Sequence, residues 1–420
     1  MTDSESLFEK LKSMGVQLGA NHLPEPKKKQ HSPFIGIETV VNGLDFQTVH
    51  GSTFITQDQF PTDYQHGIFP LCVEHEMDIL AAWSGATRIT HSGGENVVFL
   101  DTETSGLAGG TGTYAFLIGI GYRTQSGFEL VQFFMRDPGE EAALLAALDQ
   151  WLTRFSAVVT FNGKTFDLPL LNTRYVLNGF SSPFQRYEHL DVLQIARKLW
   201  RDRLPSRALG ELEKEIVHFS RTQEEVPGWL IPQLYFDYLR NGDARPLSGV
   251  FYHNAQDILS LAALYGHIAD LLKDPLHLVM GTYALDLAAI ARLYEDMGLM
   301  DQAIVLYQRS LEMGDLPEPF FCKTIDRYAQ LHRKQGEWYL AAQLWKRAAE
   351  HGEASACVEL SKYYEHHERN YLEALNWAKK ALDYFEVDQY YPGSGKTIER
   401  EIEHRIGRLY QRVYRTIGRE

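Results

Sequence analysis

The feature that most constrains the fold of this 420-residue chain is a change of pattern near Pro275. From about Val97 to that point, apolar strand-like runs alternate with helical patterns, which predicts an α/β domain with one central sheet and helices on both faces. After it, the patterns are helical only. The first three strand-like runs are joined by short links and should be antiparallel neighbours, whereas the later strands, each reached through a helix, should be parallel.

The second part repeats itself. Three helical segments align through Ala303, Ala341 and Ala374, and each follows another amphipathic segment. Paired helices with a period of about 34 residues are typical of tetratricopeptide repeats, in which small residues let neighbouring helices approach closely. An irregular helical bundle is the alternative interpretation. We predict a helix and basic linker over residues 1–36, a small β-rich extension over 37–95, the α/β domain over 96–274 and helical repeats over 275–420.

Composition excludes several classes of protein. The chain has 41 Lys and Arg against 55 Asp and Glu, a net charge of −14, so any contact with phosphate must be local or mediated by metal ions. Three cysteines without a C-x-x-C pair indicate neither a disulfide framework nor a zinc knuckle. No apolar run approaches the roughly 18 residues of a membrane span. We therefore expect a cytoplasmic protein.

Four acidic residues follow or begin the predicted elements of the α/β part. Asp101 and Glu103 come where the apolar run VVFL ends, and their spacing places both side chains on one side of a strand. Asp167 precedes a helix, where capping is the simpler role, and Asp257 is expected near the first turn of another helix, where it could interact with the helix dipole.

If these four acids meet at one sheet edge, their mutual repulsion requires divalent cations. Oxygen ligands favour Mg²⁺ or Mn²⁺. Two such ions, about 4 Å apart, can support hydrolysis of a phosphodiester. The four acids therefore predict a two-ion site.

These motifs resemble those of the DEDD-type exonucleases in the DnaQ-like ribonuclease H superfamily, and in particular the YprB-like branch, which joins this nuclease fold to a tetratricopeptide tail. DTETSGL at 101–107 matches the first motif, NGKTFD at 162–167 the second and HNAQDI at 253–258 the third. The resemblance covers residues from about 97 to 272. It implies an α/β ribonuclease H-like domain, with a mixed central sheet, followed by an all-α tetratricopeptide-like solenoid.

The resemblance also implies an activity and a set of residue roles. It implies hydrolysis of single-stranded DNA or RNA in the 3′-to-5′ direction. Asp101, Glu103 and Asp257 would hold the ion that activates the attacking water, Asp101 would also bridge to the second ion, and Asp167 would hold that second ion. Thr102 and Asn162, which lie within the motifs, are expected to contact the substrate.

The general base departs from the pattern of this family. One subclass has His five residues before the last Asp, and another has Tyr four residues before it, whereas here Tyr252 and His253 occupy the exchanged positions. Residues four apart share a helix face, so His253 should lie on the side of Asp257. Histidine is also the better base near neutral pH. We predict that His253 is the base, with Tyr252 as the alternative; a helix-start residue bonded to the backbone is the structural interpretation of His253.

A basic cluster near Trp200 has two interpretations. Arg197, Lys198 and Arg207 could contact phosphates, or they could form a solvated helix face. The sequence also leaves open a nucleic-acid-binding adaptor that does not cut, and a structure-selective endonuclease. A protein partner is expected for the helical repeats.

Overall fold

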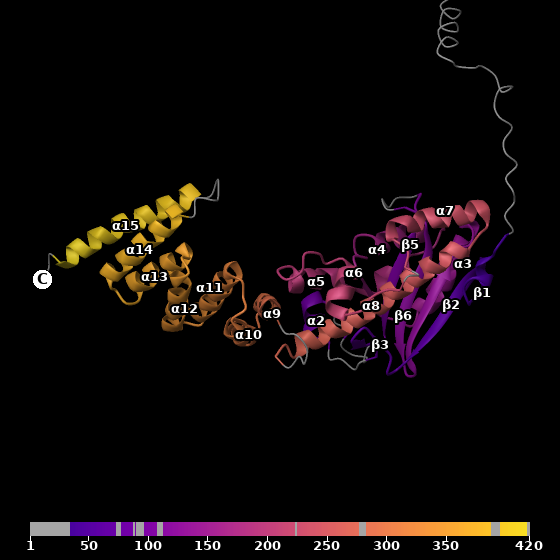
Figure 1. Ribbon diagram of the computed structural model, residues 1–420, viewed down its shortest axis with the longest axis horizontal. Coiled ribbons are helices and arrows are strands. Elements are labelled where there is room, and N and C mark those ends of the chain that lie inside the picture. Colours follow the sequence, from indigo (N-terminus) through magenta and orange to yellow (C-terminus); the bar gives the residue numbers. More distant parts are fainter. Residues whose placement is uncertain are drawn as a thin grey trace, which may run out of the picture.

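A computed structural model describes residues 34–72, 77–86, 89, 96–106, 112–222, 225–276, 283–387 and 395–417. The predicted N-terminal helix and most of its basic linker lie outside these residues. In Figure 1 an α/β domain is followed by a region of helices that extends away from one end of it.

A seven-stranded mixed sheet organises the α/β domain in the order β1-β2-β7-β6-β5-β8-β9. The bounds of these strands are β1 Leu44–Thr48, β2 Gly51–Pro61, β5 Val97–Thr104, β6 Ala115–Thr124, β7 Gly127–Phe134, β8 Ala157–Thr160 and β9 Glu188–Asp191. As predicted, β5, β6 and β7 are antiparallel neighbours, and β8 and β9 continue the sheet in parallel. A separate two-stranded ribbon is formed by β3 (Gln65–His66) and β4 (Phe69–Pro70).

The β-rich extension expected over residues 37–95 contributes directly to this sheet. Strand β2 pairs antiparallel with β7 over Phe54–Pro61, and β1 forms the edge beyond it. The pairing joins residues 66 to 80 positions apart, which a local pattern does not reveal. Two strands of the extension are therefore part of the α/β domain.

Apolar side chains on the two faces of the sheet form two cores, because successive residues of a strand point to opposite sides. On β5, Val97 and Phe99 face one core, and Val98 and Leu100 face the other. The first core contains residues of α5 and α8, and the second contains residues of α3, α4 and α7. The helices of the α/β domain are α2 Asp78–Ser84, α3 Glu141–Leu152, α4 Asp167–Leu177, α5 Val192–Trp200, α6 Leu209–Leu212, α7 Ile231–Asn241 and α8 Ser248–Lys273.

The helical region comprises α9 Ala284–Asp296, α10 Met300–Met313, α11 Glu318–Lys334, α12 Trp338–Glu350, α13 Ala354–His366, α14 Tyr371–Val387 and α15 Gly395–Ile417. Ala303, Ala341 and Ala374, at the aligned positions, are all fully buried. None of the helices that the structure describes is long and apolar enough to cross a membrane.

The two parts share a packed contact. Leu287 and Ile290 of α9 belong to the same apolar core as Trp200 of α5. Polar pairs surround it, with Arg203 Nε 2.9 Å from Asp286 Oδ1. The helical region is therefore anchored on the α/β domain through α5.

Candidate active site

Strand β5 brings the first two acids into the middle of the sheet. The strand continues beyond the apolar run VVFL through Asp101 and Glu103 to Thr104, so both acids lie on one strand, as predicted. It continues because β6 pairs with it along this length, whereas the pairs with parallel β8 end at Phe99. A register shift follows between Glu103 and Thr104, and such bulges often re-aim side chains next to active sites. The carboxylate-bearing end of β5 is thus open on its β8 side.

Asp101 is fixed by an amide from α8. Asn254 Nδ2 donates to Asp101 Oδ2 at 2.8 Å, and Asn254 Oδ1 accepts from Gln132 Nε2 at 2.9 Å. Gln132 Oε1 in turn accepts from the Thr56 hydroxyl at 3.1 Å. Because the Asn254 and Gln132 side chains are both almost fully buried, this chain of hydrogen bonds fixes which atom of Asn254 faces the acid.

The chain of hydrogen bonds follows one row across four strands. Thr56, Gln132, Gly119 and Asp101 are successive partners in the register of β2, β7, β6 and β5. The row needs a glycine, since a Cβ at Gly119 would lie 2.2 Å from Asn254 Oδ1. This support was not predicted from the sequence, although Asn254 lies inside the third motif.

Helix α8 supplies the third acid and the predicted base. It begins at Ser248, so Asp257 lies in its third turn, and the expectation of a place near the first turn is wrong. His253 and Asp257 share a face, as predicted from their spacing, with His253 Nε2 3.4 Å from Asp257 Oδ2 and 3.9 Å from Glu103 Oε1. Tyr252 is engaged elsewhere, because its hydroxyl oxygen accepts from the backbone N–H of Thr222 at 3.0 Å.

A carboxylate orients the imidazole of His253. Glu225 Oε1 lies 2.7 Å from His253 Nδ1, and since a carboxylate only accepts, this hydrogen bond needs the proton on Nδ1. In the neutral ring, Nε2 then carries the lone pair and faces Asp257 and Glu103. The contact therefore leaves Nε2 able to accept a proton.

The fourth acid, Asp167, comes from the start of α4 and contacts Thr102 of β5. Asp167 is the first residue of α4, whose N-cap is Phe166, and its Oδ1 accepts from the Thr102 hydroxyl at 2.5 Å. The loop before α4 is held by Asp191, which caps α5 and also accepts from the backbone N–H groups of Asn162 and Lys164. Asp191 therefore fixes the start of α5 and the loop before α4 together.

The acids interact through their charges. Burial, together with the charges of Asp257 and Asp167, raises the pKa of Asp101 well above its usual range. Burial and the charges of Asp101, Asp257 and Asp167 raise the pKa of Glu103 in the same way. Burial raises the pKa of Asp167 to about 6, although the Thr102 hydroxyl opposes this shift. Each of these acids would be stabilised in its charged form by a cation.

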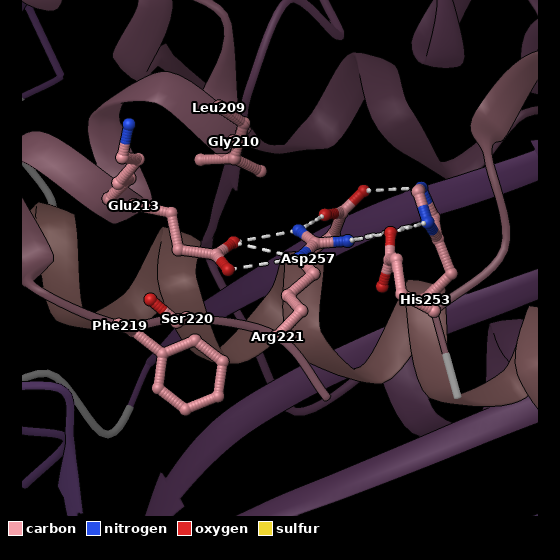
Figure 2. Close-up of a pocket in the computed structure, with 10 residues that line it drawn as sticks. Leu209, Gly210, Glu213, Phe219, Ser220, Arg221, His253 and Asp257 are labelled. Carbon is pink, nitrogen blue, oxygen red and sulfur yellow. Dashed lines mark hydrogen bonds and ion pairs between the residues drawn. The ribbon is translucent and has the colours of Figure 1, made fainter. Parts of the chain in front are cut away.

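Three charged residues at the site were not predicted. Arg221, Glu213 and Glu225 line a pocket of about 430 Å³ together with His253 and Asp257 (Figure 2). They come from the segment between α6 and α7, which begins with a π-helix over Glu213–Val217 and has no apolar periodicity. Insertions of this type are frequent at functional sites.

The predicted substrate contacts lie in different places. Thr102 is buried against Asp167, and Asn162 is exposed in the loop before α4, where its positive φ of 65° fits a left-handed turn. Lys198 Nζ pairs with Asp296 Oδ2 of α9 at 2.9 Å. Arg207 donates to the backbone oxygen of residue 204, and Arg197 is exposed on α5. Their roles toward a substrate remain predictions.

The donor set suits a hard divalent cation. Ligand atoms of Glu103, His253 and Asp257 all lie within 4.8 Å of one another, and Asp101 and Asp167 add charges to the same cluster. Carboxylate oxygens dominate, as Mg²⁺ and Mn²⁺ prefer. The raised pKa values of Asp101 and Glu103 point the same way, since both carboxylates have other carboxylates as charged neighbours.

A mixed sheet with two acids on an interior strand and a third acid on the helix across it defines a ribonuclease H-like domain. Residues 98–269 match the RNase_H superfamily, from the start of β5 to the end of α8. The chain is also 30% identical over 382 residues to YprB, an uncharacterized protein of Bacillus subtilis (strain 168), and this match spans 88% of the present chain and 91% of the relative. The chain therefore belongs to the YprB family, and its RNase H superfamily domain indicates a nuclease-like function.

Proposed function

We propose that this protein is a metal-dependent exonuclease of the DEDD type, which removes nucleotides from the 3′ end of single-stranded DNA or RNA. The observation that carries the proposal is the cluster of Glu103, His253 and Asp257, with Asp101 and Asp167 electrostatically coupled to it. Carboxylates held this closely repel one another, which lowers the stability of the fold unless they bind a cation. The metal ions of a phosphodiester hydrolase would be such cations.

Asp101, Glu103 and Asp257 would hold one Mg²⁺ or Mn²⁺ ion, and Asp167 with Asp101 would hold a second. Such ions make water a better nucleophile and neutralise charge on the leaving oxygen. The chain itself positions these ligands from the interior strand β5, the start of α4 and the third turn of α8. Rigid elements of this kind favour precise geometry at the reacting phosphate.

His253 is proposed as the general base. Its Nε2 faces the acids, while Glu225 holds the proton on Nδ1, so the ring is set to take a proton from a water in the cleft. Tyr252 is less suited, because its hydroxyl oxygen is bonded to the backbone of Thr222. His253 is also among the candidate ligand atoms, and a role as ligand is the alternative that mutagenesis must test.

The helical region is proposed to bind a protein partner and to take no part in the chemistry. The buried alanines at the three aligned positions support a stack of tetratricopeptide-like helix pairs. Its first helix packs on α5, so the partner would be held next to the α/β domain.

The test is incubation of end-labelled single- and double-stranded DNA and RNA with Mn²⁺, with the Asp101→Asn variant as the matched control. We expect shortening from the 3′ end of single strands by the wild type only. Internal cuts at junctions would instead favour a structure-selective endonuclease. Binding without cutting would favour an adaptor.

A further inference from the structure

Arg221 is the one residue whose guanidinium reaches three acids of the pocket in Figure 2 among the residues that the structure describes. Its Nη2 donates to Asp257 Oδ1 and, at 2.7 Å, to Glu213 Oε2. Its Nη1 donates to Glu225 Oε1 at 2.9 Å and lies 3.3 Å from His253 Nδ1. The arginine thus lies between an acid that anchors it and the residues proposed for catalysis.

The anchor is part of the folded core. Glu213 is 2% exposed and accepts from both Nε and Nη2 of Arg221, which is the paired geometry that a guanidinium forms with a carboxylate. Glu213 Oε2 also accepts from the Ser260 hydroxyl at 2.9 Å, and Ser260 Oγ lies 2.7 Å from His66 Nε2. Arg221 is therefore held in place by buried groups from three separate segments of the chain.

Arg221 brings a positive charge to a site that is otherwise strongly acidic. Its charge lowers the pKa of both Asp101 and Glu103, against the larger effect of burial. The other cation of the pocket lining, Lys214, has a side chain that is 69% exposed. A phosphodiester anion that approaches the acids therefore meets one positive charge in a fixed position.

We infer that Arg221 is a phosphate-binding residue of this site, which contacts the nucleic-acid phosphate next to the cleaved bond through its Nη1 and Nη2 groups. This inference rests on the proposed function. A planar guanidinium matches two oxygens of a phosphate, and the edge of Arg221 that binds Glu213 differs from its Nη1–Nη2 edge, which contacts Glu225 and Asp257 in the free protein.

The same geometry links substrate binding to cation binding. Asp257 Oδ1 accepts from Arg221 Nη2, so a cation that takes this oxygen competes with the guanidinium and leaves Nη2 for a phosphate oxygen. Loss of Arg221 should therefore weaken the binding of nucleic acid while leaving Mn²⁺ affinity equal or higher. A merely structural role would lower both together.

The test compares R221Q and R221K with R240Q, which removes an exposed arginine of α7 and serves as the charge-matched control. Mn²⁺ affinity is measured by calorimetry without nucleic acid. Binding of a 5′-fluorescein-labelled oligothymidylate is measured by anisotropy with Ca²⁺, and kcat and KM are measured with Mn²⁺.

For R221Q we expect oligothymidylate binding at least about 10-fold weaker and kcat/KM lower by about 10²- to 10³-fold, the range for loss of one charge-stabilising donor. For R221K, which keeps the charge and a partner for Glu213, we expect an intact fold and a loss of about 10-fold, because the planar fork is absent. If R221Q does not fold, the comparison of R221K with R240Q tests the inference.

The inference is overturned if both Arg221 variants bind and cut like R240Q, or if Mn²⁺ affinity falls by the same factor as activity. A wild-type protein that cuts neither DNA nor RNA would instead contradict the proposed function. The binding measurement would still decide the role of Arg221 in that case, because it does not depend on cleavage.

Discussion

Glu365 in the helical region and Asp101 in the α/β domain are both buried carboxylates, but their surroundings are opposite. Glu365 Oε2 lies 2.8 Å from Arg405 Nη1 and 2.8 Å from Arg408 Nη2, and Arg412 Nη1 lies 3.5 Å from Oε1. Asp101 instead has Asp257 and Asp167 as the neighbours that raise its pKa. The first acid is neutralised by the protein itself, and the second is not.

This difference separates an acid that the fold neutralises from one that is proposed to bind a cation. A fold that only needs a buried carboxylate surrounds it with cations from its own chain, as α15 does for Glu365. In the α/β domain several carboxylates lie together and Arg221 offsets only part of their repulsion. The remaining repulsion lowers stability, and an added cation relieves it.

Asp101→Asn should have the largest effect on activity. The change keeps the size of the side chain and an oxygen for Asn254 Nδ2, but removes the charge that a cation needs. Cation binding contributes several kcal/mol to such transition states, so hydrolysis should fall by at least about 10³-fold. Single-turnover cleavage of a labelled oligonucleotide at saturating Mn²⁺ measures the effect. Activity near the wild-type level would remove Asp101 from the metal site.

His253→Ala should lower kcat by about 10²- to 10⁴-fold, the contribution of a positioned base, with Mn²⁺ affinity nearly unchanged. Tyr252→Phe, which removes only the hydroxyl, is the matched control and should have little effect. Calorimetric Mn²⁺ titration separates a base from a ligand. A parallel loss of Mn²⁺ affinity in His253→Ala would make His253 a ligand, and a severe effect of Tyr252→Phe would make Tyr252 the base.

Glu365→Gln should affect stability and leave the chemistry intact. Removing this buried charge leaves Arg405, Arg408 and Arg412, which are partly exposed, without their common partner, at a cost of about 1–3 kcal/mol in the free energy of unfolding. Glu312→Gln, in an exposed pair with Arg309, is the control and should cost about 0–1 kcal/mol. Urea denaturation measures both. A neutral Glu365→Gln would show that its arginines are satisfied by solvent.

Much of the scaffold could be predicted because it depends on local patterns. The strand-like runs around Asp101 and Ile118 are long and joined by short links, which fixed β5, β6 and β7 as antiparallel neighbours. The four acids fall inside ordered motifs, on β5, α4 and α8. Local pattern alone did not place the start of α8 correctly, because Val250 and Phe251 in its first turn pack into the core and extend the helix ahead of Asp257.

The rest depends on contacts between distant segments. Glu213 and Arg221 lie in an irregular segment, and their partners Ser260 and Asp257 come from α8. Lys198 was predicted to contact phosphate, but a distant residue, Asp296 of α9, pairs with its charge in the folded chain. No spacing rule connects such residues, so the sequence predicts the acids of the site but not the arginine among them.

Asn254→Ala should reduce activity by about 10- to 100-fold, which is typical for loss of a group that orients a metal ligand. The variant frees Asp101 Oδ2 and leaves Gln132 Nε2 without one of its acceptors, while Phe251 O still accepts from it at 2.9 Å. Steady-state kinetics over a range of Mn²⁺ concentrations tests the role. An unchanged Mn²⁺ dependence together with unchanged kcat would show that β5 holds Asp101 without help.

The smallest expected effect is on the stability of the protein without metal. The pKa of Asp101, Glu103 and Asp167 is raised in the folded state, so below about pH 4 these acids are protonated whether the chain is folded or unfolded. As the pH rises through this value, the unfolded chain releases protons that the folded chain still holds, and the free energy of unfolding falls until the folded pKa, about 6 for Asp167, is passed.

Asp101→Asn removes one of these acids and a charge that raises the pKa of Glu103. With EDTA at neutral pH the variant should therefore be more stable than the wild type by about 1 kcal/mol, and the difference should vanish at acidic pH. Mn²⁺ should reverse the order, because the wild type binds the ion more tightly. Urea denaturation from acidic to neutral pH, with EDTA or Mn²⁺, measures all three effects. A variant less stable than the wild type in EDTA at neutral pH would place Asp101 with Glu365, as an acid that the fold itself needs.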